Sequence, residues 1–201
     1  LAATNTLGGT SAWTFYNLQL GDTFQVGTTT PLFTSTTTVS GRLTIESAHY
    51  LDAGGTQWDL AGTGTVFVET GTFQEDTSTI RYSGAGSNVL STQYYNLDIN
   101  SGSGGQTYVA TGLGMIVDGD LTVGGDAAST FDLNTVDPLI DVNGDVVIRN
   151  NGIISASDSD DFTIAGSYDN DGTFTSNGGT VTFDGSGAIG IAAGNSSFSN
   201  L

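Results

Sequence analysis

The residues Val117-Asp118-Gly119-Asp120-Leu121 contain the pattern from which the fold can be predicted: apolar, any residue, glycine, any residue, apolar. Further copies are Val39-Ser40-Gly41-Arg42-Leu43, Val142-Asn143-Gly144-Asp145-Val146 and Ile164-Ala165-Gly166-Ser167-Tyr168. When Gly62 and Gly84 are added, the glycines from Gly41 to Gly84 lie 21 and 22 residues apart, and those from Gly119 to Gly166 lie 25 and 22 residues apart. An interval of about 20–25 residues is typical of one coil of a β-solenoid, in which equivalent residues stack on the coils above and below.

Strand signals surround this pattern, whereas the apolar spacing of an amphipathic helix is missing. Thr65-Val66-Phe67-Val68 and Asp145-Val146-Val147-Ile148 are short β-prone runs, and Gly, Asn or Asp separates such runs throughout the chain. We therefore predict an all-β fold. The predicted architecture is a single-stranded parallel β-helix (β-solenoid), with residues 1–201 forming one elongated segment. Inward apolar side chains of one coil would be sheltered only by the neighbouring coils.

A second motif, aromatic-x-Asn-Leu, occurs at 15–18, 94–97 and 198–201. Its asparagines are 79 and 104 residues apart, which is close to the length of an immunoglobulin-like unit. Tandem β-sandwich domains are therefore the alternative fold. Because the third copy stops at the last residue, we expect the chain to be a piece of a longer repetitive protein.

The charge balance excludes several partners. The chain has 21 acidic and three basic residues, for a net charge of −18, and it has no cysteine. Such a chain repels phosphate backbones, so we expect no nucleic-acid binding. No apolar run approaches the roughly 20 residues that span a bilayer, so no membrane insertion is expected in this segment. The composition favours an extracellular or cell-surface location.

The chain also resembles a known class of proteins. Gly179-Thr180-Val181-Thr182-Phe183-Asp184-Gly185-Ser186-Gly187, Gly119-Asp120-Leu121-Thr122-Val123 and Tyr94-Tyr95-Asn96-Leu97-Asp98-Ile99 are similar to repeats of large bacterial adhesin-like surface proteins with a parallel β-helix fold. This resemblance implies a long extracellular stalk, adhesin or filament. It brings no catalytic residues.

The residues with the most chemical potential are acidic. Asp158, Asp160, Asp169 and Asp171 are the candidate metal ligands, because hard oxygen ligands at alternate positions suit Ca²⁺. No EF-hand loop closes around them, and the alternative is that they form turns on a solvated edge. We expect no cofactor other than this candidate calcium.

Other side chains give little support to catalysis. His49 is the only histidine, so no evident catalytic triad or multi-histidine metal site forms, and we expect it at the surface or at a strand end. Trp13, Trp58 and the pair Tyr94-Tyr95 could stack on sugars, but their alternating positions favour the core. We expect no enzyme activity.

These observations predict a non-catalytic structural segment of an extracellular filament, sheath or adhesin stalk. Its partners would be further copies or neighbouring repeats, end to end. The alternative function is a calcium-dependent carbohydrate-binding or adhesion module that contacts surface glycans.

Overall fold

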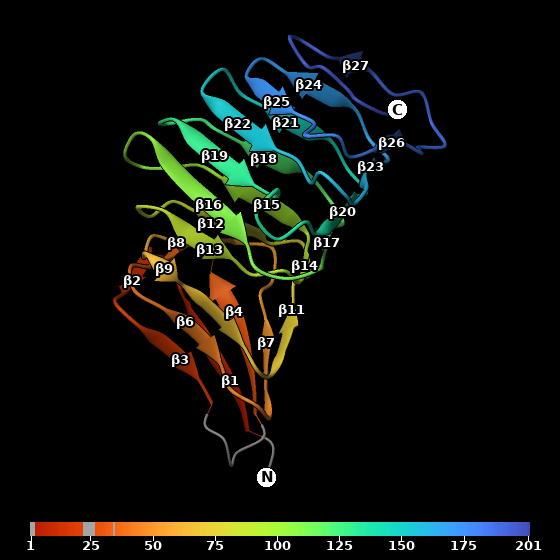
Figure 1. Cartoon of the computed structure of the whole chain (residues 1–201). Coiled ribbons are helices and arrows are strands. Elements are labelled where there is room, and N and C mark those ends of the chain that lie inside the picture. Colours follow the sequence, from red (N-terminus) through yellow and green to blue (C-terminus); the bar gives the residue numbers. More distant parts are fainter. Residues whose placement is uncertain (1–2, 22–26, 34) are drawn as a thin grey trace.

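The chain folds as a parallel β-solenoid, with the first and the last of its described strands at opposite ends of the stack (Figure 1). The computed structural model describes residues 3–21, 27–33 and 35–201, and the side chains of all of these except 3–6, 8, 9 and 30–33. The predicted segment 1–201 thus includes a few residues outside the described part. Every strand pairing among the described residues is parallel, and none of these residues is helical.

One sheet, here called the long sheet, runs through the whole stack. Its nine strands in spatial order are β2 (Trp13–Phe15), β5 (Thr37–Val39), β8 (Gln57–Leu60), β12 (Thr79–Tyr82), β15 (Asn96–Ile99), β18 (Leu121–Val123), β21 (Val146–Ile148), β24 (Tyr168–Asn170) and β27 (Ile191–Ala192). Each coil contributes one strand to the long sheet and then passes through two further sheets, except that the coil between β8 and β12 passes through three.

These two further sheets change partway along the stack. In the N-terminal part they are a three-stranded sheet of β3 (Leu18–Leu20), β6 (Leu43–Ile45) and β10 (Phe67–Glu69), and a four-stranded sheet of β1 (Ala3–Gly9), β4 (Gly27–Phe33), β7 (His49–Asp52) and β11 (Thr72–Gln74). A six-stranded sheet and a five-stranded sheet replace them in the C-terminal part. The six-stranded sheet is β9 (Gly64–Thr65), β13 (Ser87–Val89), β16 (Gln106–Ala110), β19 (Ser129–Asp132), β22 (Gly152–Ser155) and β25 (Thr173–Thr175). The five-stranded sheet is β14 (Gln93–Tyr94), β17 (Gly114–Val117), β20 (Leu139–Val142), β23 (Phe162–Ile164) and β26 (Val181–Phe183).

The strand register confirms the predicted coil length. Leu121 pairs with Val146, 25 residues on, and Val146 pairs with Tyr168, 22 residues on. The shortest coil is the one from Ile80 to Leu97, at 17 residues. Because β-sandwich sheets are antiparallel, the all-parallel register also shows that the tandem-sandwich alternative is wrong.

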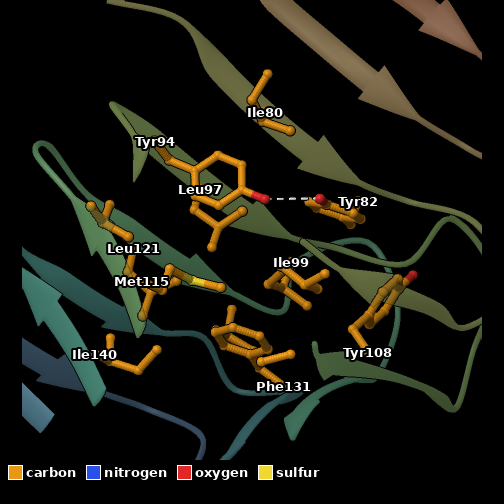
Figure 2. Packing of buried hydrophobic residues seen from close by; sticks show 14 of the residues in the cluster. Ile80, Tyr82, Tyr94, Leu97, Ile99, Tyr108, Met115, Leu121, Phe131 and Ile140 are labelled. Carbon is orange, nitrogen blue, oxygen red and sulfur yellow. Dashed lines mark hydrogen bonds between the residues drawn. The ribbon is translucent and has the colours of Figure 1, made fainter. Parts of the chain in front are cut away.

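The core is a continuous column of apolar side chains between the sheets (Figure 2). Trp58 and Tyr94, two of the predicted core aromatics, are completely buried, whereas Trp13 is 37% exposed. Strands such as β6 and β18 alternate buried, half-buried, buried, so each coil covers the apolar residues of the next coil.

A closed ring of three hydrogen bonds lies inside this core. The Leu90 N–H donates to Tyr82 Oη at 3.2 Å, Tyr82 and Tyr94 share a hydroxyl–hydroxyl bond of 2.9 Å, and Tyr94 Oη donates to the Leu90 carbonyl at 2.5 Å. Figure 2 shows the two rings pointing their hydroxyls at each other. Since Tyr94 already donates to Leu90, the Tyr82 hydroxyl is the donor to Tyr94. Both buried hydroxyls and both polar groups of Leu90 are thereby satisfied.

Candidate functional site

The four candidate calcium ligands lie at separate places on the solenoid surface. Asp158 and Asp160 are in the loop between β22 and β23, Asp169 is on the outer face of β24, and Asp171 is in the turn before β25. All four are exposed. No three carboxylate or histidine side chains in the described part of the chain converge in an arrangement that could hold a metal ion. The structure therefore does not bring these four aspartates together as one ligand set.

Other polar and acidic side chains link one coil to the next. At the corner that precedes the long sheet, Asn96 Oδ1 accepts a hydrogen bond from the backbone N–H of Asp120 at 2.9 Å. Asp120 Oδ1 accepts from the N–H of Asp145 at 2.9 Å, and Asp145 Oδ1 accepts from the N–H of Ser167 at 2.7 Å. Ser167 Oγ accepts in turn from the N–H of Gly190 at 3.2 Å. We call this column the corner ladder. Each of its side chains satisfies a backbone donor of the following coil.

The corner ladder shows how the two sequence motifs fit together. Asn96 comes from an aromatic-x-Asn-Leu motif, and a Cβ added to Gly119 of the following coil would lie 2.4 Å from Asn96 Oδ1. The N-terminal copy behaves in the same way: Asn17 Oδ1 accepts from the N–H of Arg42, next to Gly41. Asparagine on one coil and glycine on the next therefore form a single corner, in which only glycine leaves room for the amide side chain.

The three motif copies, however, lie at three different corners. Asn17 follows the long-sheet strand β2, Asn96 is the first residue of the long-sheet strand β15, and Asn200 pairs with Thr180 at the corner before the five-stranded sheet. The glycine pattern divides likewise: Gly41, Gly62 and Gly84 follow the long sheet, and Gly119, Gly144 and Gly166 precede it. The intervals of 79 and 104 residues are therefore not the period of a domain.

A second column alternates amides with carboxylates. Gln93 Nε2 donates to Glu75 Oε1 at 3.1 Å and to Asp118 Oδ2 at 2.6 Å, and Asn143 Nδ2 donates to Asp118 Oδ1 at 2.9 Å. Carboxylates stacked directly at the strand spacing of about 4.8 Å would repel each other. The Gln93 amide separates Glu75 from Asp118 and donates a hydrogen bond to each of them.

One charged cluster lies on the outer face of the long sheet. Arg81 is in register with Asp59 on one side and Asp98 on the other, and its guanidinium also pairs with Asp126. Arg81 Nε is 3.9 Å from Asp98 Oδ2. Burial raises the pKa of Asp98, although the positive charges of Arg81 and Arg149 oppose this shift. Two of the three arginines, Arg81 and Arg149, thus lie near one half-buried carboxylate.

His49 lies at a strand end, as predicted, but it is buried instead of being at the surface. It begins β7, is 5% exposed, and its Nε2 lies 2.8 Å from Thr29 Oγ1. A Cβ added to Gly21 of the preceding coil would lie 2.7 Å from the His49 side chain, which shows how closely the ring is covered. Burial lowers the pKa of His49.

Acid should therefore weaken the fold through His49. Above pH ~6.5 the imidazole is neutral in both the folded and the unfolded chain. As pH falls below ~6.5 the unfolded chain takes up a proton that the buried ring resists, so the free energy of unfolding falls, by at most about 1.4 kcal/mol per pH unit. The measurement is urea unfolding at a series of pH values for the wild type and His49→Gln. The variant should lack this part of the pH dependence. Equal pH dependence in both proteins would contradict the assignment.

Comparisons of the chain with protein-family models, with curated proteins and with solved structures return no match. The resemblance to adhesin repeats therefore stays an expectation from the sequence, while the parallel β-solenoid is established by the strand register. In the part of the chain that the structure describes, no helix has the length and apolar character needed to cross a bilayer.

Proposed function

We propose that this chain is a non-catalytic structural segment of an extracellular filament, sheath or adhesin stalk. The corner ladder is the observation that carries the proposal. Asn96, Asp120, Asp145 and Ser167 each use a side-chain oxygen to bind the next coil. In this column, acidic and polar side chains that could otherwise serve catalysis or metal binding hold the coils in a continuous stack.

The two ends of the stack also suit a longer assembly. Trp13 in the N-terminal coil is 37% exposed, and Ile191 and Leu201 in the C-terminal coil are 50% and 77% exposed. A further coil, from the same chain or from another copy, would cover these side chains and pair with the open strand edges. The net charge of −18 would keep neighbouring rods from clumping sideways.

Electron microscopy of intact cells that make the protein tests this function. Gold-labelled antibodies against the chain should decorate projecting filaments or a surface sheath without permeabilisation. Labelling that requires permeabilised cells, or that follows no extended surface structure, would contradict the proposal.

A further inference from the structure

A polar groove of about 440 Å³ lies beside the corner that follows β2. Three successive coils line it, and the side chains important here are Tyr16, Gln19, Ser40, Arg42, Thr63 and Thr65. Its volume falls in the range of small-molecule sites. All six side chains carry a hydroxyl, amide or guanidinium group, and Tyr16 adds an aromatic ring, so the groove suits a polar ligand.

The aromatic ring of Tyr16 lines the groove and is not buried in the core. It occupies the second position of aromatic-x-Asn-Leu, the place that Tyr95 takes in the next copy. Tyr95 is half-buried, and its ring carbon Cε1 lies 3.2 Å from the place where a Cβ on Gly119 would be. Tyr16 is instead 76% exposed, and the Tyr16 atoms closest to the same place at Gly41 belong to its backbone. Two identical motif positions thus differ in whether the ring packs on the solenoid or stands clear of it.

Arg42 supplies oriented donors to the same groove. Its Nε donates to the carbonyl of Thr65 at 3.1 Å, which holds the guanidinium in place. Both ion pairs in the described part of the chain belong to Arg81, so Arg42 forms none there. The side chain of Arg42 is exposed. An oriented guanidinium with free N–H groups is suited to pairs of oxygen acceptors.

We propose that this groove binds a neutral saccharide. The C–H face of a pyranose ring would stack on Tyr16, and two vicinal hydroxyls would accept hydrogen bonds from Arg42, with Gln19 and Ser40 beside them. An aromatic ring next to a few placed polar groups is the usual composition of a site for a ligand with one apolar face. A neutral sugar is favoured over a uronate or a sulfated glycan because the chain carries −18 charges. The assignment is independent of the structural role proposed above.

The test is a panel of neutral oligosaccharides of glucose, galactose, mannose and N-acetylglucosamine, with polygalacturonate and a sulfated glycan as acidic probes. Binding is measured with a calcium chelator present. The best neutral oligosaccharide should bind the wild type, and Tyr16→Ala should weaken that binding about tenfold or more. Arg42→Gln should weaken it about fivefold. Tyr16→Phe keeps the ring and should bind nearly as well as the wild type. Leu113→Ala, which removes another highly exposed apolar side chain (80% exposed), should bind normally.

Three outcomes would overturn the proposal: binding of no neutral member of the panel, preference for the acidic probes, or equal affinity of Tyr16→Ala and the wild type. Circular dichroism of each variant separates loss of the groove from loss of the fold. If Tyr16→Ala misfolds, the Arg42→Gln and Tyr16→Phe pair decides the result, because the proposal requires the first to weaken binding and the second to preserve it.

Discussion

Gly84→Ala is expected to destabilise the solenoid by about 3 kcal/mol or more. Gly84 is buried at the corner that follows β12, and a Cβ there would lie 1.7 Å from the carbonyl oxygen of Gly62 on the preceding coil. It would also lie 2.7 Å from the oxygen of Ala61. Both neighbours are backbone atoms, which cannot rotate away as a side chain can. The two coils must separate locally, and this weakens the strand pairing on both sides of the corner.

Gly114→Ala is the matched control for this prediction. Gly114 begins β17, and a Cβ on it would meet no atom within 4 Å. We expect its effect to stay within about 0.5 kcal/mol. The free energy of unfolding of both variants is measured with urea. Comparable stability of the two variants would show that Gly62 and Gly84 are not stacked as described.

Alkaline unfolding should be steep and should depend on the buried tyrosine pair. Burial raises the pKa of Tyr82 to about 12 and raises the pKa of Tyr94 well above 10. Because these pKa values are higher in the folded chain, their stabilising contribution is complete below pH ~10 and is lost as pH rises towards ~12. For Tyr82 alone the loss is on the order of 3 kcal/mol. Circular dichroism and the ultraviolet absorbance of tyrosinate, followed together, should show the ionisation of the buried tyrosines coinciding with unfolding.

Tyr94→Phe tests the same hydrogen-bond ring at neutral pH. This variant leaves the Tyr82 hydroxyl without its acceptor and the Leu90 carbonyl without its donor, at a cost of roughly 1–3 kcal/mol. Tyr16→Phe is the control, because the Tyr16 side chain is largely exposed.

For the alkaline prediction, ionisation of Tyr82 and Tyr94 near pH 10 in a chain that stays folded would contradict the burial of these two tyrosines.

The coil length could be predicted from the sequence because glycine is needed where the backbones of two neighbouring coils lie close together at a corner. Gly62, Gly144 and Gly166 each lie where a Cβ would meet a backbone oxygen of the preceding coil. The sequence could not show that the glycines form two columns, since apolar-x-Gly-x-apolar is compatible with either corner of the long sheet. That distinction depends on which strands pair, and strand pairing is set by the whole coil.

The environments of single side chains were harder to predict. Tyr16 and Tyr95 share a motif position, but only neighbouring side chains decide whether each ring packs on glycine or projects outward. His49 looked like a surface residue because its burial depends on Gly21 and Thr29, which lie more than one strand away in the sequence. The sequence does not indicate the role of Asp120 and Asp145 in the corner ladder, because the hydrogen-bond partner of each side chain is on another coil.

Cysteine cross-linking tests the stacked coils most directly, because the chain contains no cysteine of its own. Thr122 and Val147 are register partners on the adjacent strands β18 and β21. The strand spacing of about 4.8 Å falls within the Cα separation of a disulfide. The pair Thr122→Cys and Val147→Cys should therefore form a disulfide on mild oxidation in the folded protein, and should do so poorly in urea.

The pair Thr122→Cys and Asp169→Cys is the control. Asp169 is in register with Val147, so it lies two coils from Thr122, at roughly 10 Å, beyond the reach of a disulfide. Efficient cross-linking of the first pair and none of the second is the predicted result. No cross-link between positions 122 and 147, or equal cross-linking of both pairs, would contradict the parallel stack.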